Sequence, residues 1–312
     1  MVDLTRYLPG AYASRELARL GAKVVHVEPP EGDPMRRAAP AWDAALRAGA
    51  ESVVCDLDTD VAFARALCSR ADVVLEGFRP GVAERIGISP DDLPDTVVYC
   101  SITGFGDSAR HRTRAGHDVN YLGWAGALED TAPTLPPIQI ADLAAGALGA
   151  VTGVLAALLE RTSTGKGARL LVSMTHRSLD LVAHRLGGEP RSRLLTGGLA
   201  CYGIYATADG RHLTLGALEP KFFRRLCELV SRADLAEHQF DEDQEALAAE
   251  LASIFARRTL DDWLREFENE DVCVGPVATR TEAARDLGYE GSSEPVPLGA
   301  HTELWRRELG VR

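Results

Sequence analysis

Short apolar segments alternate with helical segments over the first 106 residues, and this alternation constrains the fold more than any other feature of the sequence. The segments KVVHVE, SVVCDL, DVVLEGF and TVVYCSITGFG have the length and β-branched content of buried strands. The intervening TDVAFARALCSRA is typical of a helix. Apolar strands that alternate with helices indicate a parallel sheet covered on both faces. We therefore expect an α/β fold with a doubly wound, mostly parallel, Rossmann-like sheet.

The carboxyl ends of these strands indicate where a ligand should bind, because open parallel sheets bind ligands beyond the carboxyl ends of their strands. The carboxyl ends of the four expected strands lie at residues 28–29, 56–57, 77–79 and 103–104. We expect these loops to contribute to the site.

The pattern changes after residue 106 and predicts a second, smaller domain. A short helix is expected in GHDVNYLGWAGALED, and a long helix should begin near Asp142 and end before Gly165. Further along, a hairpin in LACYGIYATADGRHLTLGAL precedes amphipathic helices and the late strand VCVGPVAT, which is typical of an α+β domain. We expect a large α/β domain over 1–186, a small α+β domain over 187–275, and a C-terminal segment over 276–312 that returns to the large domain.

The charge balance argues against nucleic acid and anionic membranes as partners. The chain has 34 Lys and Arg against 46 Asp and Glu, for a formal net charge of −12. Both partners require a basic protein surface. An anionic ligand would need a local basic pocket. The uncharged run over 143–159 is short for a membrane span and rich in Ala and Gly, so we interpret it as a buried core helix.

The six cysteines indicate buried thiols rather than a disulfide framework or a zinc site. None of them lies in a CxxC pair, and most lie inside apolar runs such as SVVCDL and VVYCSI. The chain opens with MVDLTRYLPG, which has no basic and then apolar leader. These features predict a cytoplasmic protein without a metal site.

Three residues are candidates for catalysis, and each also has an ordinary structural explanation. His117 in AGHDVNY is either a base in a pocket or a helix-start histidine paired with Asp118 or a backbone carbonyl. Asp142 precedes a long apolar run, where aspartate often caps a helix. Glu219 precedes Pro220 at a helix start, where the helix dipole favours a carboxylate.

Together these residues suggest a proton-transfer site. A neutral imidazole accepts a proton at neutral pH, and a carboxyl group carries one there only if burial raises its pKa. A histidine and a carboxyl group that face one carbon from opposite sides are the two groups that a 1,1-proton transfer needs. The sequence alone does not show that they face each other.

Four segments of this chain resemble a known family. GHDVNYLGWAGAL, ADLAAGALGAVTGVLAALLERTSTGKG, YATADGRHLTLGALEPKFF and VCVGPV are similar to the family III CoA-transferase superfamily, most of all to its alpha-methylacyl-CoA racemases. HVEPPEGDPMRR, DVVLEGFRPGVAERIGI and VYCSITGFG match in the same order, so the resemblance covers nearly the whole chain.

The resemblance implies roles for individual residues. It implies His117 and Asp142 as the acid/base pair, with Glu219 supporting His117, and it implies an interlocked homodimer in which Glu219 comes across the interface. No cofactor is implied beyond the coenzyme A carried by the substrate. Backbone N–H groups at the Asp142 helix start are expected to stabilise the enolate oxygen. The predicted substrate-binding and CoA-binding residues are Arg36, Cys55, Asp56, Leu57, Arg79, Arg85, Gly116, Asp118, Asn120 and Tyr121.

One segment departs from the family pattern. Relatives carry basic residues before the second strand of the pattern, where the CoA nucleotide lies, but this chain has Ala48, Ala50 and Glu51 there, and Asp58 where Lys is usual. The loss of one charge-assisted contact costs about 1.5–3 kcal/mol. Other cations that could substitute are Arg36, Arg37, Arg47, Arg79 and Arg85.

Three hypotheses about function follow. The first is a racemase or epimerase that inverts the alpha carbon of a 2-methylacyl-CoA through an enolate. The second is a CoA-transferase in which Asp142 is the nucleophile. The third keeps the scaffold without CoA, as a biosynthetic enzyme on another carbonyl compound or as a binding protein. The sequence does not predict the acyl group, the stereochemical preference or the pathway.

Overall fold

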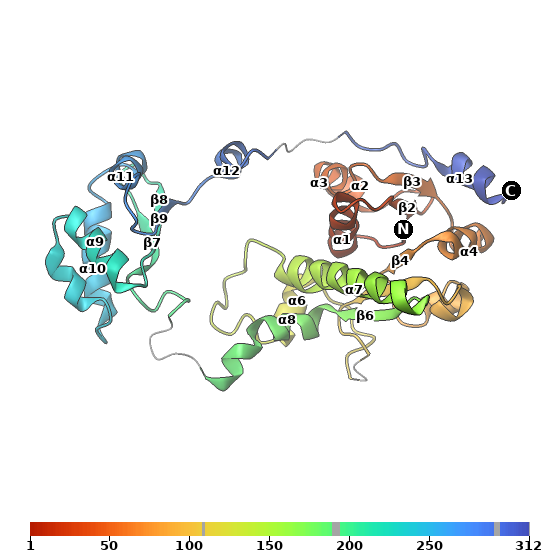
Figure 1. Cartoon of the computed structure of the whole chain (residues 1–312), viewed down its shortest axis with the longest axis horizontal. Coiled ribbons are helices and arrows are strands. Elements are labelled where there is room, and N and C mark those ends of the chain that lie inside the picture. The colour runs from red at the N-terminus through yellow and green to blue at the C-terminus, as the bar shows by residue number, and fades with distance from the viewer. Residues whose placement is uncertain (108–109, 189–193, 290–293, 312) are drawn as a thin grey trace. The chain divides into compact units, whose positions relative to one another are not determined.

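Six strands form one parallel sheet, which confirms the predicted fold class (Figure 1). The structure is a computed structural model that describes residues 1–107, 110–188, 194–289 and 294–311. The strand order is β3-β2-β1-β4-β5-β6, so the direction in which the sheet grows reverses between β1 and β4. All five strand pairs are parallel. The strands are β1 (Val2–Asp3), β2 (Val25–Glu28), β3 (Glu51–Val54), β4 (Val73–Glu76), β5 (Val98–Thr103) and β6 (Arg169–Ser173).

Helices cover both faces of this sheet, which explains why its strands are apolar on both sides. On one face, α1 and α7 pack on the strands through side chains such as Leu17 and Val154. On the other face, α4 and the C-terminal α13 contribute Phe63 and Trp305. The remaining helices of this unit lie in the connections. The helices are α1 (Leu8–Arg19), α2 (Met35–Ala38), α3 (Pro40–Leu46), α4 (Val61–Arg70), α5 (Val82–Arg85), η1 (Pro90–Asp92), α6 (Asp118–Trp124), η2 (Ala141–Leu148), α7 (Gly149–Thr164), α8 (Met174–Val182), η3 (Ala183–Gly187) and α13 (Thr302–Leu309).

The end of the chain, from residue 294 on, belongs to the large unit and covers the outer edge of β3. The Val54 N–H donates to Thr302 Oγ1 over 2.9 Å, and the Ser52 carbonyl accepts the N–H of His301 over 2.9 Å. The Trp305 indole donates to Glu51 Oε2 over 2.7 Å. The edge of the sheet is therefore paired rather than open. Glu51, which stands where relatives carry a basic residue, is a hydrogen-bond partner of this segment.

The turn between β1 and α1 is fixed by a buried carboxylate. Asp3 accepts hydrogen bonds from the Thr5 N–H, 2.8 Å, and the Ser14 hydroxyl, 2.7 Å. A Cβ at Gly10 would lie 1.8 Å from Thr5 Oγ1, so only glycine allows this close approach. Arg47 donates to Asp3 over 2.9 Å and is itself buried, so it is not available as a substitute cation for phosphate.

The second unit, Arg185–Glu290, is the predicted α+β domain. A three-stranded antiparallel sheet, β7-β8-β9, packs on helices through Phe223, Leu251 and Phe255. The unit ends at residue 290 rather than 275, because Glu282 of α12 forms an ion pair of 2.9 Å with Arg211 beside β8. Its elements are β7 (Tyr202–Ala206), β8 (His212–Gly216), α9 (Pro220–Leu229), η4 (Ala233–His238), α10 (Gln244–Phe255), α11 (Leu260–Phe267), β9 (Val274–Pro276) and α12 (Arg280–Asp286).

Two composition-based predictions can be compared with the structure. All six cysteines are unpaired thiols, but Cys273 is exposed, whereas the sequence suggested that they are buried. The continuous helix over Ala141–Thr164 is long and apolar enough to cross a membrane by length and composition. Its inner face packs against the sheet through Ala150 and Val154, as expected for a core helix.

Candidate functional site

A cavity of about 380 Å³ lies where the strand order reverses. Its walls include residues 5–7 and 9–10, which follow β1, residues 77–80, which follow β4, and residues 102–105 at the end of β5. In open α/β sheets, ligands bind at this topological switch point. His117 and Asp142 both line the cavity, so the structure brings the predicted acid/base pair into one site.

His117 is held at the start of α6 by its own backbone. It is the N-cap residue of the helix, in an extended conformation, and its N–H donates to Asn120 Oδ1 over 3.1 Å. The imidazole is exposed and faces the cavity. Asn120, which the resemblance assigned to substrate binding, therefore has a backbone-positioning contact in this structure.

Tyr121 of α6 packs against two neighbouring loops, at Gly104 and at Gly116. Its hydroxyl donates to the Gly116 carbonyl, and its buried ring leaves no space for a side chain at Gly104, where a Cβ would lie 2.5 Å away. Burial, followed by the charges of Asp142 and Asp118, raises the pKa of Tyr121 to about 12. The phenol is therefore a neutral donor at physiological pH.

Asp142 lies in the first turn of η2, which is wound as a π-helix over Ala141–Leu148. Such wider turns often occur at functional sites. Burial, together with the nearby charge of Asp118, raises the pKa of Asp142 to about 7. Both protonation states of this carboxyl group are therefore populated near neutral pH, as a group that alternates between acid and base requires.

The helix-cap explanation for Asp142 is not what the structure shows. Ile140, two residues earlier in the chain, is the N-cap residue of η2, and among the described residues the Asp142 carboxylate accepts no capping N–H. Instead, the Asp142 N–H donates to Asp118 Oδ1 over 2.9 Å, and the Leu143 N–H donates to the Gln139 carbonyl over 2.9 Å. These two N–H groups therefore have partners within the protein, and the predicted stabilisation of an enolate oxygen by backbone N–H groups at this helix start stays a prediction.

Glu219 belongs to the second unit. It is the N-cap residue of α9 and precedes Pro220 at the first helical position. Its carbonyl accepts the Phe222 N–H over 3.0 Å. This placement matches the predicted helix start, and the proposed support of His117 by Glu219 stays a prediction.

The predicted CoA-binding residues divide into two groups. Arg79, Gly116 and Tyr121 line the cavity, whereas Asp118 and Asn120 belong to α6 and do not line it, although Asp118 is bonded to Asp142. The second group does not line the cavity: it comprises Arg36, Cys55, Asp56, Leu57 and Arg85.

The contacts of this second group explain why. Arg36 donates to both carboxylate oxygens of Glu28, 2.5 and 2.6 Å, and to the Val296 carbonyl. Asp56 accepts from the Asp58 N–H and the Thr59 hydroxyl in the turn after β3. These two side chains therefore serve the local fold.

The other three residues have similar local explanations. Arg85 lies 3.5 Å from Asp58 on the surface. Cys55 is buried, which raises the pKa of its thiol to about 12, and Leu57 packs against the same core. Asp58 is therefore paired with a cation rather than exposed alone to a ligand.

The sequence analysis missed three arginines of the cavity, Arg6, Arg112 and Arg114. With Arg79 they give the cavity four guanidinium groups, and Asp142 is the one carboxyl group among the lining residues described. The signal for two of them was the basic run RHRTR over 110–114.

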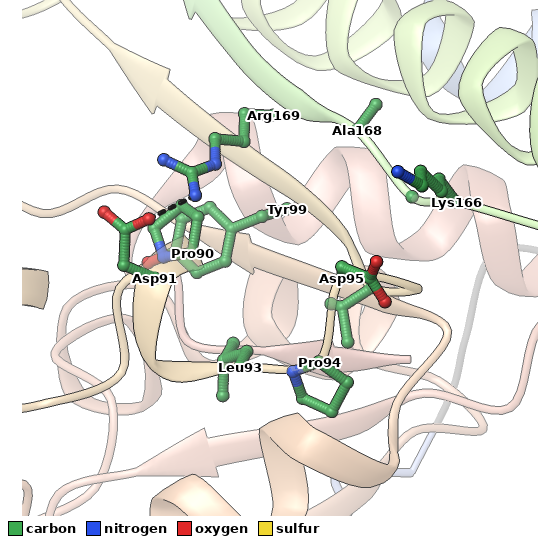
Figure 2. A pocket seen from close by; sticks show the side chains of 11 residues that line it. Pro90, Asp91, Leu93, Pro94, Asp95, Tyr99, Lys166, Ala168 and Arg169 are labelled. Atoms are coloured by element: carbon green, nitrogen blue, oxygen red, sulfur yellow. Dashed lines mark hydrogen bonds and ion pairs between the residues drawn. The ribbon is translucent and has the colours of Figure 1, made fainter.

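A second hollow, of about 400 Å³, lies at the amino ends of β5 and β6 (Figure 2). Figure 2 shows the Arg169 side chain paired with Asp91 at its rim, with Tyr99 and Lys166 nearby. None of the candidate catalytic residues lines it. Across the described ranges 1–107, 110–188, 194–289 and 294–311, no three or more His, Cys, Asp or Glu side chains are grouped to hold a metal ion.

The fold and the cavity define an α/β protein whose ligand site combines a histidine with a carboxyl group of raised pKa. The chain belongs to the CoA-transferase family III, which it matches over residues 1–294. The predicted family is therefore confirmed.

Named relatives fall into two activity classes. The chain is 34% identical over 303 residues to alpha-methylacyl-CoA racemase from Homo sapiens, covering 90% of this chain and 77% of the relative. It is 28% identical over 309 residues to succinyl-CoA:glutarate CoA-transferase from Mus musculus, covering 89% and 70%. The crystal structure of a CAIB/BAIF family protein from Brucella suis superposes with a TM-score of 0.82 at 25% identity, covering 99% of this chain and 97% of that one. These relatives support an enzymatic activity.

Proposed function

We propose that this chain is a racemase or epimerase that inverts the alpha carbon of a 2-methylacyl-CoA thioester by 1,1-proton transfer. The observation that carries this proposal is the presence of His117 and Asp142 in one cavity, with the pKa of Asp142 raised to about 7. One group removes the alpha proton to give an enolate, and the other returns a proton to the opposite face. In the reverse direction the two groups exchange roles.

The cationic cavity supports the enolate intermediate. Negative charge moves onto the thioester oxygen when the alpha proton leaves, and fixed positive charge stabilises it without reorganisation. Arg6 and Arg79 follow β1 and β4 and line the same cavity as the acid/base pair. They also supply the local basic pocket that an anionic thioester needs in a chain of net charge −12.

Isotope exchange tests the proposal directly. One epimer of a 2-methylacyl-CoA, incubated with the chain in deuterated water, is expected to gain deuterium at C2 and to form the other epimer. In the same assay Asp142→Asn should form no second epimer. Asp95→Asn, which changes an exposed carboxylate outside the cavity, is the matched control for this variant. Absence of exchange with every acyl-CoA tested would count against the racemase.

The alternative function is a CoA-transferase that uses Asp142 as its nucleophile. Transferases among the relatives favour it, and an ionised fraction of Asp142 near neutral pH is compatible with it. The prediction specific to this alternative is a covalent acyl intermediate on Asp142 that hydroxylamine traps. Transferase activity that survives Asp142→Ala would exclude it.

A CoA-independent enzyme remains the third hypothesis, since seven of the ten predicted substrate-binding and CoA-binding residues do not line the cavity. Calorimetric titration with CoA separates it from the others. Binding that weakens as salt increases would support a CoA site, because screening weakens charge pairing with phosphates. Absence of binding would favour a substrate without CoA.

We also propose the homodimer that the resemblance implies, and a cytoplasmic location, which the six free thiols support. Exposed leucines at the end of η2, on α7, on the edge strand β6 and on α8 support an interface. Leu159→Arg is expected to give a monomer by sedimentation, whereas Leu287→Arg, in the other unit, should not. The exposed leucines are Leu148, Leu155, Leu159, Leu171 and Leu179.

A further inference from the structure

The basic segment 110–114 lies beside the acid/base pair and has no part in proton transfer. We propose that Arg112 and Arg114 bind a carboxylate on the acyl group, so that the preferred substrate is the monothioester of a dicarboxylic acid. This inference rests on the proposed function and names its substrate class. Both arginines line the cavity that contains His117 and Asp142.

The charge of the cavity is opposite to that of the chain. The protein carries a formal net charge of −12, yet four arginines line this cavity, against Asp142 as the one carboxyl group among the described lining residues. A cleft lined by one sign of charge concentrates ligands of the opposite sign. The arginine guanidinium also matches the planar geometry of a carboxylate, to which it can donate two parallel hydrogen bonds.

Aromatic contacts hold the segment against α6. The His111 ring lies 4.3 Å from the Trp124 ring and 5.7 Å from Phe105. Burial, followed by the charges of Arg114 and Arg110, lowers the pKa of His111, so its ring packs as a neutral aromatic group. The Arg114 guanidinium lies 5.3 Å from the centre of the Trp124 ring. The segment is therefore anchored on the helix that His117 caps.

Arg112 has a partner that a ligand can replace. Its Nε lies 3.5 Å from Asp107 Oδ1, and both side chains are substantially exposed. Exposed pairs of this kind contribute little to stability. A substrate carboxylate that forms a bidentate pair inside the cavity would offset the loss of this contact.

The size of the cavity favours the acyl end of the substrate over the CoA phosphates. At about 380 Å³, it has the volume of a small-ligand site. We therefore expect a group bound by Arg112 or Arg114 to belong to the acyl end of the substrate. The pantetheine arm separates the CoA phosphates from the thioester by a much longer chain.

Two substrates that differ in one group test the proposal. 2-Methylglutaryl-CoA, joined through C1, ends in a carboxylate, and 2-methylpentanoyl-CoA has a methyl group there. We expect Arg112→Gln and Arg114→Gln each to lower kcat/KM for the carboxylated substrate about tenfold or more, the usual effect of losing a hydrogen bond to a charged group. Turnover of the neutral substrate should stay near that of the wild type. Arg19→Gln, which changes an exposed arginine outside the cavity, is the control.

The outcomes are distinguishable. Equal losses on both substrates, with weaker CoA binding by calorimetry, would assign the arginines to the phosphates and overturn the proposal. Unchanged kinetics on both would also overturn it. If the wild type racemises neither thioester, the proposed function fails on its own. Calorimetry with free 2-methylglutarate and 2-methylpentanoate then decides: carboxylate-selective binding that both variants lose supports the site, and its absence refutes it.

Discussion

Replacing Asp142 with Asn should stabilise the folded chain at alkaline pH, by an amount that can be calculated from its surroundings. The pKa of Asp142 is about 7 in the folded state because the carboxyl group is buried beside Asp118. In the unfolded chain it is about 3.9. Each pH unit between these values corresponds to about 1.4 kcal/mol, so the ionised carboxylate costs the folded state about 4 kcal/mol.

The sign follows from proton binding. Below about pH 4 the carboxyl group is neutral in both states and costs nothing. Between about pH 4 and pH 7 the unfolded chain loses this proton while the folded chain keeps it, so the stability of the wild type falls as pH rises. Asn does not titrate. The stability of Asp142→Asn relative to the wild type should therefore rise by about 2 kcal/mol between about pH 5.5 and pH 8.5.

Urea denaturation at these two pH values, followed by tryptophan fluorescence, measures the difference. Asp95→Asn is the control, because its exposed side chain lies at the opposite end of the strands, and its stability relative to the wild type should change little with pH. A relative stability of Asp142→Asn that is independent of pH, or that falls as pH rises, would refute the assignment of a raised pKa to Asp142.

Three further predictions concern the same site. Asp142→Asn should still exchange the C2 proton of the epimer that His117 deprotonates, but should form no second epimer. Chiral chromatography with mass detection measures both outcomes. Full racemisation by this variant would contradict the two-base mechanism. Asp118→Asn keeps an acceptor for the Asp142 N–H but removes a charge, so the apparent pKa near 7 in the pH–rate profile should fall; an unchanged profile would contradict the electrostatic role. Gly104→Ala should cost about 1–3 kcal/mol of stability by urea denaturation, because its Cβ would lie 2.5 Å from Tyr121, and an unchanged midpoint would contradict this packing.

The sheet was predictable because its information is local. Apolar runs separated by helical segments specify parallel strands without knowledge of any long-range contact, and the strand order places the ligand at the switch point between β1 and β4. The boundary of the small unit was less predictable. It depends on the pairing of Arg211 with Glu282, which are far apart in the sequence.

The identities of the candidate catalytic residues could be predicted from the sequence, but the contacts that they and their neighbours make could not. The sequence pointed to His117 and Asp142, and the structure places both in one cavity. It did not reveal that Arg36 is held by Glu28, because the segment 28–37 also contains Glu31 and Asp33 and the sequence does not show which carboxylate pairs with which arginine. The arginines of 110–114 were not predicted to line the site, because their place in the cavity depends on the packing of His111 against Trp124 and Phe105, which the sequence does not show.

A hydrogen bond links Asp142 to the residue that follows His117, and so connects the two members of the proposed acid/base pair indirectly. Asp118 follows His117 in the chain, and its carboxylate accepts the N–H of Asp142 across 2.9 Å. The same carboxylate ties the start of α6 to the first turn of η2 and places a negative charge beside the Asp142 carboxyl group, which helps to raise its pKa. Geometry and acidity therefore depend on one side chain. A substitution that keeps the hydrogen bond but removes the charge separates these two effects, which is why Asp118→Asn is more informative at this position than a truncation to alanine.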